Sequence, residues 1–509
     1  MTKHSPARAS WPLLKGLKVF SRGKVRDTYL LGNGLLLVVA TDAISIFDFI
    51  LNALVPLKGI ILTALSVFWF KMMESFGIKT HLVAYGVTID CYLPKHLRGN
   101  MDLQSRALVV RKKDMVDTIE FIVRDCLTGT GKKAYDETGE VCGQKLPEGL
   151  QDGDELQCTL DTPSTKAKKG HDLHMSAAKV RAKHHKQTYL AIKIFQIGSR
   201  YSAKMGIKLC DTKFEFAKDG TLTDEVLTPD SSRFWSFVEW LLSRKPAKDR
   251  KAPSAYDKQL ARIWGILMGI NKLDPKKPMD VRKVHAMVVP RWLIKQLTMV
   301  YRYIFWRLTK MTIEEYLRNV MGVRIKEMPP KKILIICGSK TDLSAVEEML
   351  EVYHNTINAR LKGHIISCHR NPLKLMKYIK GLRARSFNLI ICYGGKAFAL
   401  PGVLDAWIYQ FKKHIPVAGV ASGEYGSKEL MAAQLSIDEI PGQPVIMDEL
   451  TGQVYTGTSG LRELIHRADY GELPPPKLSA RRNRRVDPGS RSATRPGRRD
   501  PSRAIEGPC

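Results

Sequence analysis

Two acidic residues near the middle of the chain, Glu215 and Asp224, have the spacing of a metal site on a β-hairpin. Residues 214–216 and 222–226 have the composition of short strands, and Asp219-Gly220 between them is a strong two-residue turn. Counting outward from that turn places Glu215 opposite Asp224, where like charges repel. A cation would remove the repulsion, and oxygen ligands suit Mg²⁺, which takes its other ligands from water and nucleotide phosphates. The alternative is a solvated hairpin with two exposed acids.

A lysine on the same predicted strand extends this chemistry. Lys213 precedes Glu215 by two residues, so both side chains point to one face of the strand. There the ammonium of Lys213 could meet the charge of a nucleotide or of an acyl phosphate.

A basic, glycine-containing stretch near the N-terminus is a second candidate site. Gly23 allows the backbone to approach a phosphate closely, and Lys24 and Arg26, two apart on a strand, point to the same face. With the turn at residues 32–34, this stretch predicts a hairpin lid over a nucleotide. A solvated basic strand is the alternative.

A third candidate lies at the end of the strand predicted at residues 120–124. Arg124 stands at the end of this predicted strand, and the hydroxyl of Thr130 follows six residues later in a glycine-rich turn. Backbone N–H groups, a hydroxyl and a guanidinium together predict a phosphate cradle. A purely structural turn is the alternative.

The second half of the chain repeats one pattern three times. Residues 333–337 and 389–393 are apolar runs typical of buried parallel strands, residues 364–367 are read as a further strand, and a loop follows each of them. Loops at the carboxyl ends of parallel strands share one crevice, and the helix N-terminus after Gly338-Ser339 favours an anion there. The double proline at residues 329–330 marks the boundary with the first half.

The first half resembles SAICAR synthetase, the ATP-dependent ligase of purine biosynthesis. The motifs that carry the resemblance are DTKFEF at residues 211–216, DE at 224–225 and LTPDSSRFW at 227–235, and further matches extend over about residues 20–325. The resemblance implies an ATP site that includes Gly23, Lys24 and Arg26, and we add Lys112, which follows a strand expected beneath adenine. It also implies that Arg124, Thr130 and Arg233 bind the phosphate of a ribotide.

Three departures from the family pattern lie near these motifs. Ala43 replaces the usual Arg and so removes a charge-assisted donor expected near the nucleotide. Lys168 replaces an acid after the TPSTKA motif, and Leu173-His174 replaces a Glu-Asn pair. A decayed synthetase that serves only as a scaffold therefore remains an alternative.

The second half resembles AIR carboxylase over about residues 331–470. The matching loops are GSKTDL, SCHRNP and GGKAFALPG, in that order. The resemblance implies the following roles: Ser339 and Asp342 hold ribose or phosphate, Ser367 and Arg370 hold phosphate, His369 moves the proton at the carbon that is carboxylated, and Gly394 and Gly395 line the ribotide site.

The third of these loops bears on the substrate. Bacterial mutases, which move a carboxylate within a ribotide, have a loop similar to GGAAHLPG, whereas this chain has Lys396 and no His at that place. An ammonium there could attract a carboxylate or polarise CO₂, which makes Lys396 a catalytic candidate beside His369. The loop favours direct use of CO₂, and a mutase is the alternative.

The fold class expected from these patterns is an α+β ATP-binding synthetase domain followed by an α/β three-layer domain with a parallel sheet in flavodoxin-like order. The expected ranges are an N-terminal extension at 1–19, the synthetase domain at 20–325, a linker at 326–331, the carboxylase domain at 332–473 and a basic disordered tail at 474–509. We expect a homo-oligomer formed through the C-terminal domain. The expected substrates are AIR, CO₂, CAIR, aspartate and ATP, with Mg²⁺ as cofactor.

Composition limits the other possibilities. The net charge of +31, partly from an arginine-rich tail, leaves open a basic nucleic-acid-binding protein on an enzyme scaffold, although two anionic substrates also suit a basic protein. Nine scattered cysteines without zinc spacing, and an N-terminus without an apolar core of signal-peptide length, favour the cytoplasm.

Residues 288–308 contain four basic side chains and predict an amphipathic helix rather than a membrane span. Aromatic residues between 264 and 306 predict core packing rather than a base-stacking surface.

Overall fold

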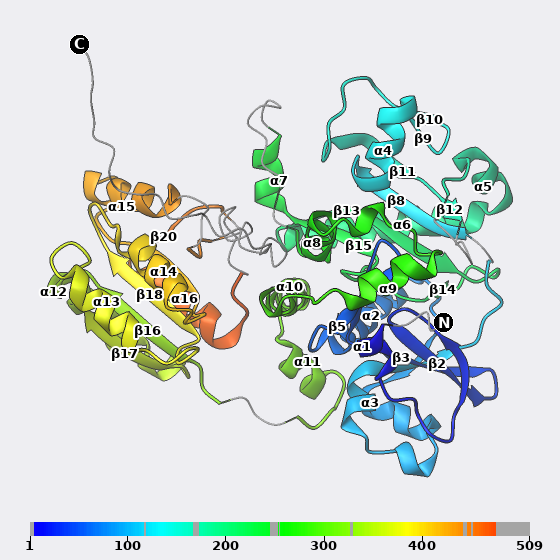
Figure 1. The fold of residues 1–509 in the computed structure, drawn as a ribbon, viewed down its shortest axis with the longest axis horizontal. Helices are drawn as coiled ribbons and strands as arrows, with labels where there is room; N and C mark the ends of the chain where they lie inside the picture. The colour runs from blue at the N-terminus through cyan, green and yellow to red at the C-terminus, as the bar shows by residue number, and fades with distance from the viewer. Residues whose placement is uncertain are drawn as a thin grey trace, which may run out of the picture.

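The computed structural model describes residues 5–116, 119–165, 173–244, 253, 255–325, 329–440, 445–448 and 451–474. Residues 326–328 of the expected linker, Lys168 and all of the expected tail after Pro474 lie outside this range. Figure 1 shows a larger N-terminal part, in blue to green, and a smaller C-terminal part, in yellow to red.

An antiparallel sheet near the N-terminus carries the GKVRD stretch. Its strands, in the spatial order β1-β2-β3-β7-β6, are β1 Lys18–Arg22, β2 Arg26–Gly32, β3 Leu35–Ala40, β7 Ala107–Arg111 and β6 Leu82–Tyr85. Asn33 and Gly34 both have positive φ, as a two-residue hairpin turn of type I′ requires. Alternation along β3 places Leu36 in the main core and Leu37 in a smaller core on the other face.

Short elements and one long helix connect this sheet to the rest of the N-terminal part. They are α1 Pro6–Ala9, β4 Ala43–Ile46, β5 Phe49–Leu54, α2 Lys58–Ser75, η1 Gly86–Tyr92, η2 Lys95–Leu97 and α3 Met101–Arg106. Helix α2 is apolar on most of its circumference, and Trp69 and Phe70 are completely buried. Such a helix lies inside the domain rather than on its surface.

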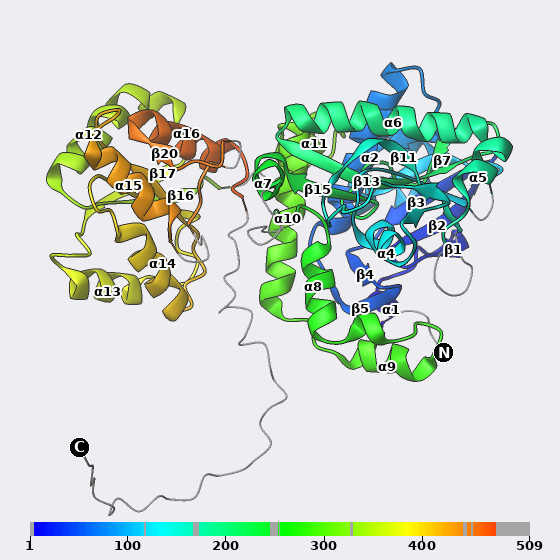
Figure 2. The same ribbon diagram turned by 90° about the horizontal axis from the view of Figure 1, so that it is seen from above.

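A second sheet carries the remaining candidate residues of the N-terminal part. Its strands are β8 Ile119–Cys126, β11 Glu155–Asp161, β12 Ser164–Thr165, β13 Ile207–Phe216, β14 Leu222–Thr223 and β15 Ser232–Ser236. The neighbouring elements are α4 Gly129–Thr138, β9 Glu140–Val141, β10 Gln144–Lys145, α5 Ala177–Lys183 and α6 His185–Lys204. Helix α6 packs across β11, β8 and β13, as Figure 2 shows.

Helices complete the N-terminal part. They are α7 Phe237–Ser243, α8 Gln259–Leu267, η4 Ile270–Lys272, α9 Pro278–Ala286, α10 Arg291–Thr309 and α11 Ile313–Asn319. Helix α10 confirms the amphipathic helix expected at 288–308, and Tyr301, Tyr303 and Phe305 are buried in the main core. Within the described residues, no helix is both long enough and apolar enough to cross a membrane.

The C-terminal part is a parallel sheet between two layers of helices. Its strands are β16 Lys332–Cys337, β17 Arg360–Ile365, β18 Leu389–Gly394, β19 Val417–Ala421 and β20 Tyr455–Thr456. Their spatial order, β17-β16-β18-β19-β20, confirms the flavodoxin-like prediction.

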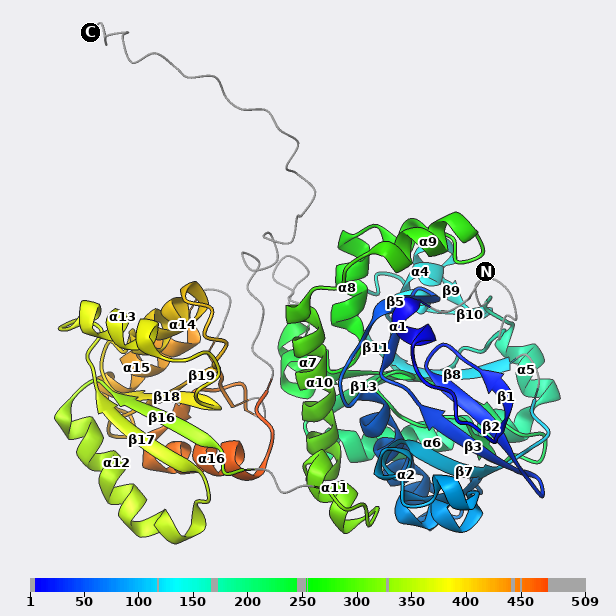
Figure 3. The same cartoon turned by 60° about the horizontal axis from the view of Figure 1, so that its bottom comes forward.

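Figure 3 shows the two helical layers of this part. The helices are α12 Lys340–Tyr353, η5 His354–Thr356, α13 Pro372–Gly381, α14 Leu400–Gln410, α15 Lys428–Asp438 and α16 Gly457–Tyr470. Side chains alternate along β16, so Leu334 and Ile336 pack with α13, α14 and α15, whereas Ile333 and Ile335 pack with α12 and α16. Both faces are covered, which explains the continuous apolar run.

The hairpin between β13 and β14 corrects the predicted register. Glu215 pairs with Thr223, not with Asp224, and β14 ends at Thr223 rather than at residue 226. The turn has three residues instead of two, because Gly220 takes a positive φ of 87° and the carboxylate of Asp219 accepts the N–H of Thr221 at 2.9 Å. One additional loop residue shifts every cross-strand pair by one position.

Candidate active sites

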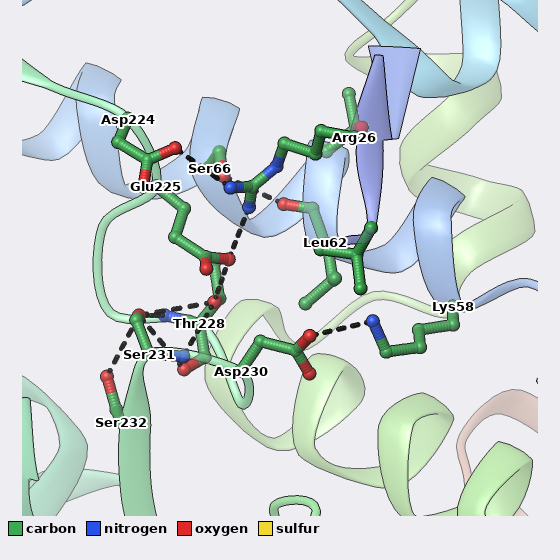
Figure 4. Close-up of polar contacts among 12 residues, drawn as sticks. Arg26, Lys58, Leu62, Ser66, Asp224, Glu225, Thr228, Asp230, Ser231 and Ser232 are labelled. Atoms are coloured by element: carbon green, nitrogen blue, oxygen red, sulfur yellow. Dashed lines mark hydrogen bonds and ion pairs between the residues drawn. The ribbon is translucent and has the colours of Figure 1, made fainter. Parts of the chain in front are cut away.

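Ion pairs connect the segment after β14, at Asp224 and Glu225, to Arg26 of the first sheet (Figure 4). Arg26, at the start of β2, donates from Nη1 to the Oδ1 of Asp224 at 2.9 Å and from Nη2 to the Oε2 of Glu225. Asp224 itself has a positive φ of 55°. The structure therefore brings together Arg26 and Asp224, which the sequence assigned to separate ATP and metal sites.

Acidic side chains are in excess around Lys213. Its ammonium donates to the Oε1 of Glu120 at 2.6 Å. Burial lowers the pKa of Lys213, but Glu120, Asp224 and Glu215 raise it by more, so the side chain stays a cation. With Glu225 and Arg26 included, this cluster has four carboxylates and two cations, which leaves two negative charges.

The donor set of this cluster fits Mg²⁺. Carboxylate oxygens are the ligands that Mg²⁺ prefers, and a divalent cation would offset the two excess negative charges. Within the described residues no group of three or more His, Cys, Asp or Glu side chains forms a metal site. If Mg²⁺ binds here, Glu215 and Asp224 would be the protein ligands, and water and phosphate oxygens would supply the others.

The GKVRD stretch forms a tight turn between β1 and β2. The N–H of Gly23 donates to the carbonyl of Arg26 at 2.7 Å, and the ammonium of Lys24 lies 2.6 Å from the Oδ1 of Asp48. Lys112 lies in the same sheet, but its backbone is at the opposite end of β2, where its N–H donates to Gly34. Its ammonium lies 5.2 Å from the ring centroid of Phe20.

Two arginines, Arg124, which is buried, and Arg233, which is partly buried, face the N-terminus of α4. Arg233 and Arg124 both approach the Oδ2 of Asp211, Arg124 at 3.7 Å. A Cβ at Gly129 would lie 2.2 Å from the Arg233 guanidinium, and one at Gly131 would lie 2.3 Å from that of Arg124. The glycines therefore allow both guanidinium groups to reach the helix N-terminus.

The residues of the predicted phosphate cradle lie together here, although Thr130 is in a helix and not in a glycine-rich turn. Thr130 is exposed in the first turn of α4, next to both glycines. A helix N-terminus and two guanidinium groups are all donors, and the helix dipole adds a partial positive charge. Arg233, from β15, and Arg124, from β8, are 109 residues apart in the chain, and they meet because both strands flank β13.

A buried polar cluster next to the cradle was not predicted from the sequence. The carboxylate of Asp230 accepts from the ammonium of Lys58 at 2.7 Å and from the hydroxyl of Tyr301 at 2.5 Å. Lys258, in the DKQ sequence, is half-buried, and burial lowers its pKa to about 8 although Asp230 opposes the shift. The sequence Asp257-Lys258-Gln259 resembles a DKQ sequence of the synthetase family and could have indicated Lys258, whereas nothing in the local sequence indicates Tyr301.

In the C-terminal part, hydrogen bonds join the predicted loops at the carboxyl ends of the strands. Arg370 donates to the carbonyl of Gly338 at 3.0 Å, and the hydroxyl of Ser367 accepts the N–H of Arg370 at 3.2 Å. Ser339 donates to the Oδ2 of Asp342 at 2.6 Å. The first two loops therefore form one surface beside the N-terminus of α12.

His369 reaches the third loop. Its Nε2 lies 3.3 Å from the carbonyl oxygen of Ala397, which can only accept, so the neutral tautomer that makes this hydrogen bond has its hydrogen on Nε2 and its lone pair on Nδ1. In that form an exposed imidazole can act as a base. Lys396 is also exposed and has a positive φ of 62°, and its N–H donates to the carbonyl of Glu429 at 3.2 Å.

A fourth loop, which the sequence did not suggest, completes this surface. The hydroxyl of Ser422, after β19, donates to the Oδ1 of Asp342 at 3.1 Å. A Cβ at Gly395 would lie 2.7 Å from the carbonyl oxygen of Ser422, so only glycine allows the third and fourth loops to pack so closely. Ser422 directly follows the apolar run at residues 417–421, and this position after a strand-like run is the pattern that could have indicated its role.

Comparison with known proteins identifies the family of each part of the chain. Residues 19–272 match the model of the SAICAR synthetase family, and residues 332–451 match that of AIR carboxylase. The phosphoribosylaminoimidazole-succinocarboxamide synthase of Saccharomyces cerevisiae is 40% identical over 284 residues, which cover 52% of this chain and 89% of the yeast protein. The chain belongs to the SAICAR synthetase family. It also carries an AIR carboxylase domain, so it is a bifunctional enzyme of de novo purine biosynthesis.

Other relatives support the assignment of the first domain. The synthase of Neisseria meningitidis serogroup C is 42% identical over 284 residues, covering 52% of this chain and 92% of its own length. The solved structure of SAICAR synthase from Saccharomyces cerevisiae, complexed with SAICAR, superimposes with a TM-score of 0.51 at 35% identity. That alignment covers 60% of this chain and 98% of the yeast chain.

Proposed function

We propose that the SAICAR synthetase domain condenses CAIR with aspartate at the expense of ATP. The observation that carries this proposal is the pair Arg124 and Arg233 at the N-terminus of α4, because it would provide a phosphate site one step along β8 and β13 from Lys213. In this arrangement the ribotide phosphate binds Arg124, Arg233 and Thr130. The imidazole carboxylate then extends toward Lys213.

The reaction has two steps on the substrate. The carboxylate of CAIR attacks the γ-phosphorus of ATP, which releases ADP and forms an acyl phosphate. The amine of aspartate then attacks the carbonyl carbon, phosphate leaves and the nitrogen loses a proton. Glu215 and Asp224 would hold Mg²⁺, which neutralises phosphate charge when bound. Lys213 contributes a second, fixed positive charge beside the transferred group.

For the AIR carboxylase domain we propose that AIR and CO₂ are the substrates. The phosphate of AIR would bind Arg370, Ser367 and the N–H groups at the start of α12, while Ser339 and Asp342 hold the ribose. A carbon–carbon bond forms between the ring and CO₂, and the ring proton passes to the Nδ1 of His369. The ammonium of Lys396 would attract the developing carboxylate beside Gly394 and Gly395.

Product analysis by mass spectrometry tests both reactions. We would incubate the full chain with AIR and then add bicarbonate, ATP with Mg²⁺, and aspartate in turn. Formation of CAIR with bicarbonate, and of SAICAR only after all additions, is the expected result. Efficient turnover of an N-carboxylated ribotide without dependence on bicarbonate would instead identify a mutase, and CAIR without SAICAR would identify a decayed synthetase.

The pKa of Lys258 gives a prediction for the synthetase. We propose that protonated Lys258 attracts the ribotide, so kcat/KM for CAIR should fall as the pH rises through about 8, where this lysine loses its proton. Lys258→Arg retains the charge at every working pH and should flatten this limb of the profile. The exposed Lys276→Arg is the matched control and should keep the wild-type profile. A Lys258→Arg profile identical to wild type would contradict this role.

The other proposals concern assembly and location. We propose that the C-terminal domain forms a homo-oligomer, and the exposed side chains of Met431 and Leu435 on α15 are consistent with an interface.

The eight cysteines of the described residues are all free thiols, which fits a cytoplasmic enzyme. The nucleic-acid alternative would show itself as a steep dependence of DNA or RNA binding on salt concentration.

A further inference from the structure

A short N-terminal segment contacts the glycine-containing loop of the proposed ATP site. This segment, residues 5–11, precedes the residues that match the synthetase family model, which begin at 19. It contains the helix α1 and one completely buried charged residue, Arg8. Burying a guanidinium is costly unless hydrogen bonds and a counter-charge compensate, so its partners indicate what holds it there.

Within the described residues, the Arg8 guanidinium hydrogen-bonds to the GKVRD stretch, residues 23–27. Nε donates to the carbonyl of Lys24 at 3.2 Å, and Nη2 donates to the carbonyl of Gly23 at 3.3 Å. Nη1 lies 3.2 Å from the Oδ2 of Asp27, and Nη2 contacts the Oδ1 of the same carboxylate. Asp27 is itself buried. One side chain therefore binds two consecutive carbonyl groups of the loop and the carboxylate that follows them.

These contacts determine which way the loop's amide groups point. A trans peptide is planar, so its C=O and N–H point in opposite directions. Because the carbonyls of Gly23 and Lys24 point to Arg8, the N–H groups of Lys24 and Val25 point to the other side of the loop. Gly23 and Lys24 are exposed, whereas Arg8 is buried. The N–H groups and the Lys24 side chain therefore lie where a phosphate could approach, in an arrangement that favours anions.

The segment is fixed at several further points. The hydroxyl of Ser5 caps α1 and donates to the carbonyl of Leu51 at 2.9 Å, and the N–H of Ala7 donates to the Oδ1 of Asn52 at 2.9 Å. Arg22 donates to the carbonyl oxygens of Arg8 and Trp11, each at 3.2 Å. These bonds connect the segment to β5 on one side and to β1 on the other.

We propose that Arg8 is a positioning residue of the nucleotide site, which holds the Gly23-Lys24 loop in the conformation that receives the phosphates of ATP. The inference rests on the proposed function, since it requires that this loop binds ATP. Arg8 touches no substrate in this arrangement and acts through the backbone of the loop. The N-terminal segment thereby becomes part of the synthetase site.

Steady-state kinetics of Arg8→Gln and Arg8→Lys test this proposal. Loss of the guanidinium should raise the KM for Mg·ATP by about tenfold or more, while the KM for CAIR and the carboxylation rate stay near wild type. Lysine restores the charge next to Asp27 but cannot bind both carbonyls, so its KM should lie between those of wild type and Arg8→Gln. The exposed Lys15→Met, which removes a nearby charge, is the matched control and should leave every constant unchanged.

Two further variants separate the possible outcomes. Asn52→Ala removes the anchor of Ala7 without burying an unpaired charge, so it should fold and give a smaller rise in the KM for ATP. Lys24→Met tests the loop directly. If Lys24→Met raises this KM while the Arg8 and Asn52 variants do not, the proposed ATP site stands and the role of Arg8 is wrong. If Lys24→Met also leaves it unchanged, the loop is not the ATP site. Equal rises in the KM values for ATP and CAIR in the Arg8 variants would overturn a specific positioning role.

Discussion

Replacing Glu215 by Gln or Asp224 by Asn is expected to abolish the ATP-dependent synthetase reaction and to leave carboxylation intact. Each substitution removes one of the two carboxylates that would hold Mg²⁺ and reduces the negative charge around Lys213. We expect kcat for SAICAR formation to fall by about a hundredfold or more. Removing one group that stabilises charge in the transition state typically lowers the rate by this amount. The measurement is SAICAR formation from CAIR, ATP and aspartate as a function of Mg²⁺ concentration.

The two variants should differ in one respect. The carboxylate of Asp224 is also paired with Arg26, so Asp224→Asn weakens the connection between the first sheet and the segment after β14. Its effect should therefore include a higher KM for ATP, whereas Glu215→Gln should mainly raise the requirement for Mg²⁺.

A carboxylate on the same hairpin provides the control for this prediction. Asp219→Asn removes a charge at the turn but retains an oxygen that can accept the N–H of Thr221, so it should behave as wild type. The carboxylase activity of the same chain reports on overall integrity. Wild-type rates of SAICAR formation in both site variants would show that the hairpin acids are structural and that the metal assignment is wrong.

Local sequence patterns predicted those parts of the structure that local forces determine. The apolar runs of the C-terminal domain predicted a parallel sheet, because strands covered on both faces need no polar alternation. The loops after these strands could be placed together for the same topological reason. Alternation could not give the register of the β13–β14 hairpin, since Asp219-Gly220 also suits a three-residue loop with Gly220 at positive φ.

The residues missed by the sequence prediction depend on contacts between distant segments. Tyr301 binds Asp230 across 71 positions of the chain, and Lys58 reaches the same carboxylate across 172. Tyr301 lies on an amphipathic helix whose pattern correctly predicts core packing, and the pattern does not show that its hydroxyl meets a buried acid. Arg8 likewise appears as one more basic residue in a charged N-terminus until its burial against Asp27 is seen.

His369→Asn is expected to remove carboxylation and to preserve the synthetase reaction. The amide of asparagine takes the place of the ring Nδ1 and is too short to reach the carbonyl of Ala397, which the Nε2 of His369 approaches at 3.3 Å. His369→Gln is therefore the companion variant, because the Nε2 of glutamine can still donate to that carbonyl and keep the second and third loops joined. The amide has no basic lone pair for the ring proton, and loss of a general base typically costs on the order of a thousandfold in rate. Loss of carboxylation in both variants would therefore separate proton transfer from the contact between the loops.

Binding and rate must be measured separately to test this role of His369. Because Arg370, Ser367 and the N-terminus of α12 remain in place, the Kd for AIR from calorimetry should stay within about threefold of wild type, less than the loss of one charged hydrogen bond would cause. The bicarbonate-dependent formation of CAIR should disappear in the same sample. His466→Asn, an exposed histidine on α16 of the same domain, should leave both quantities unchanged. Normal CAIR formation by His369→Asn would show that His369 is not the base. Another group on this surface would then take the ring proton, and Lys396 would be the next residue to replace.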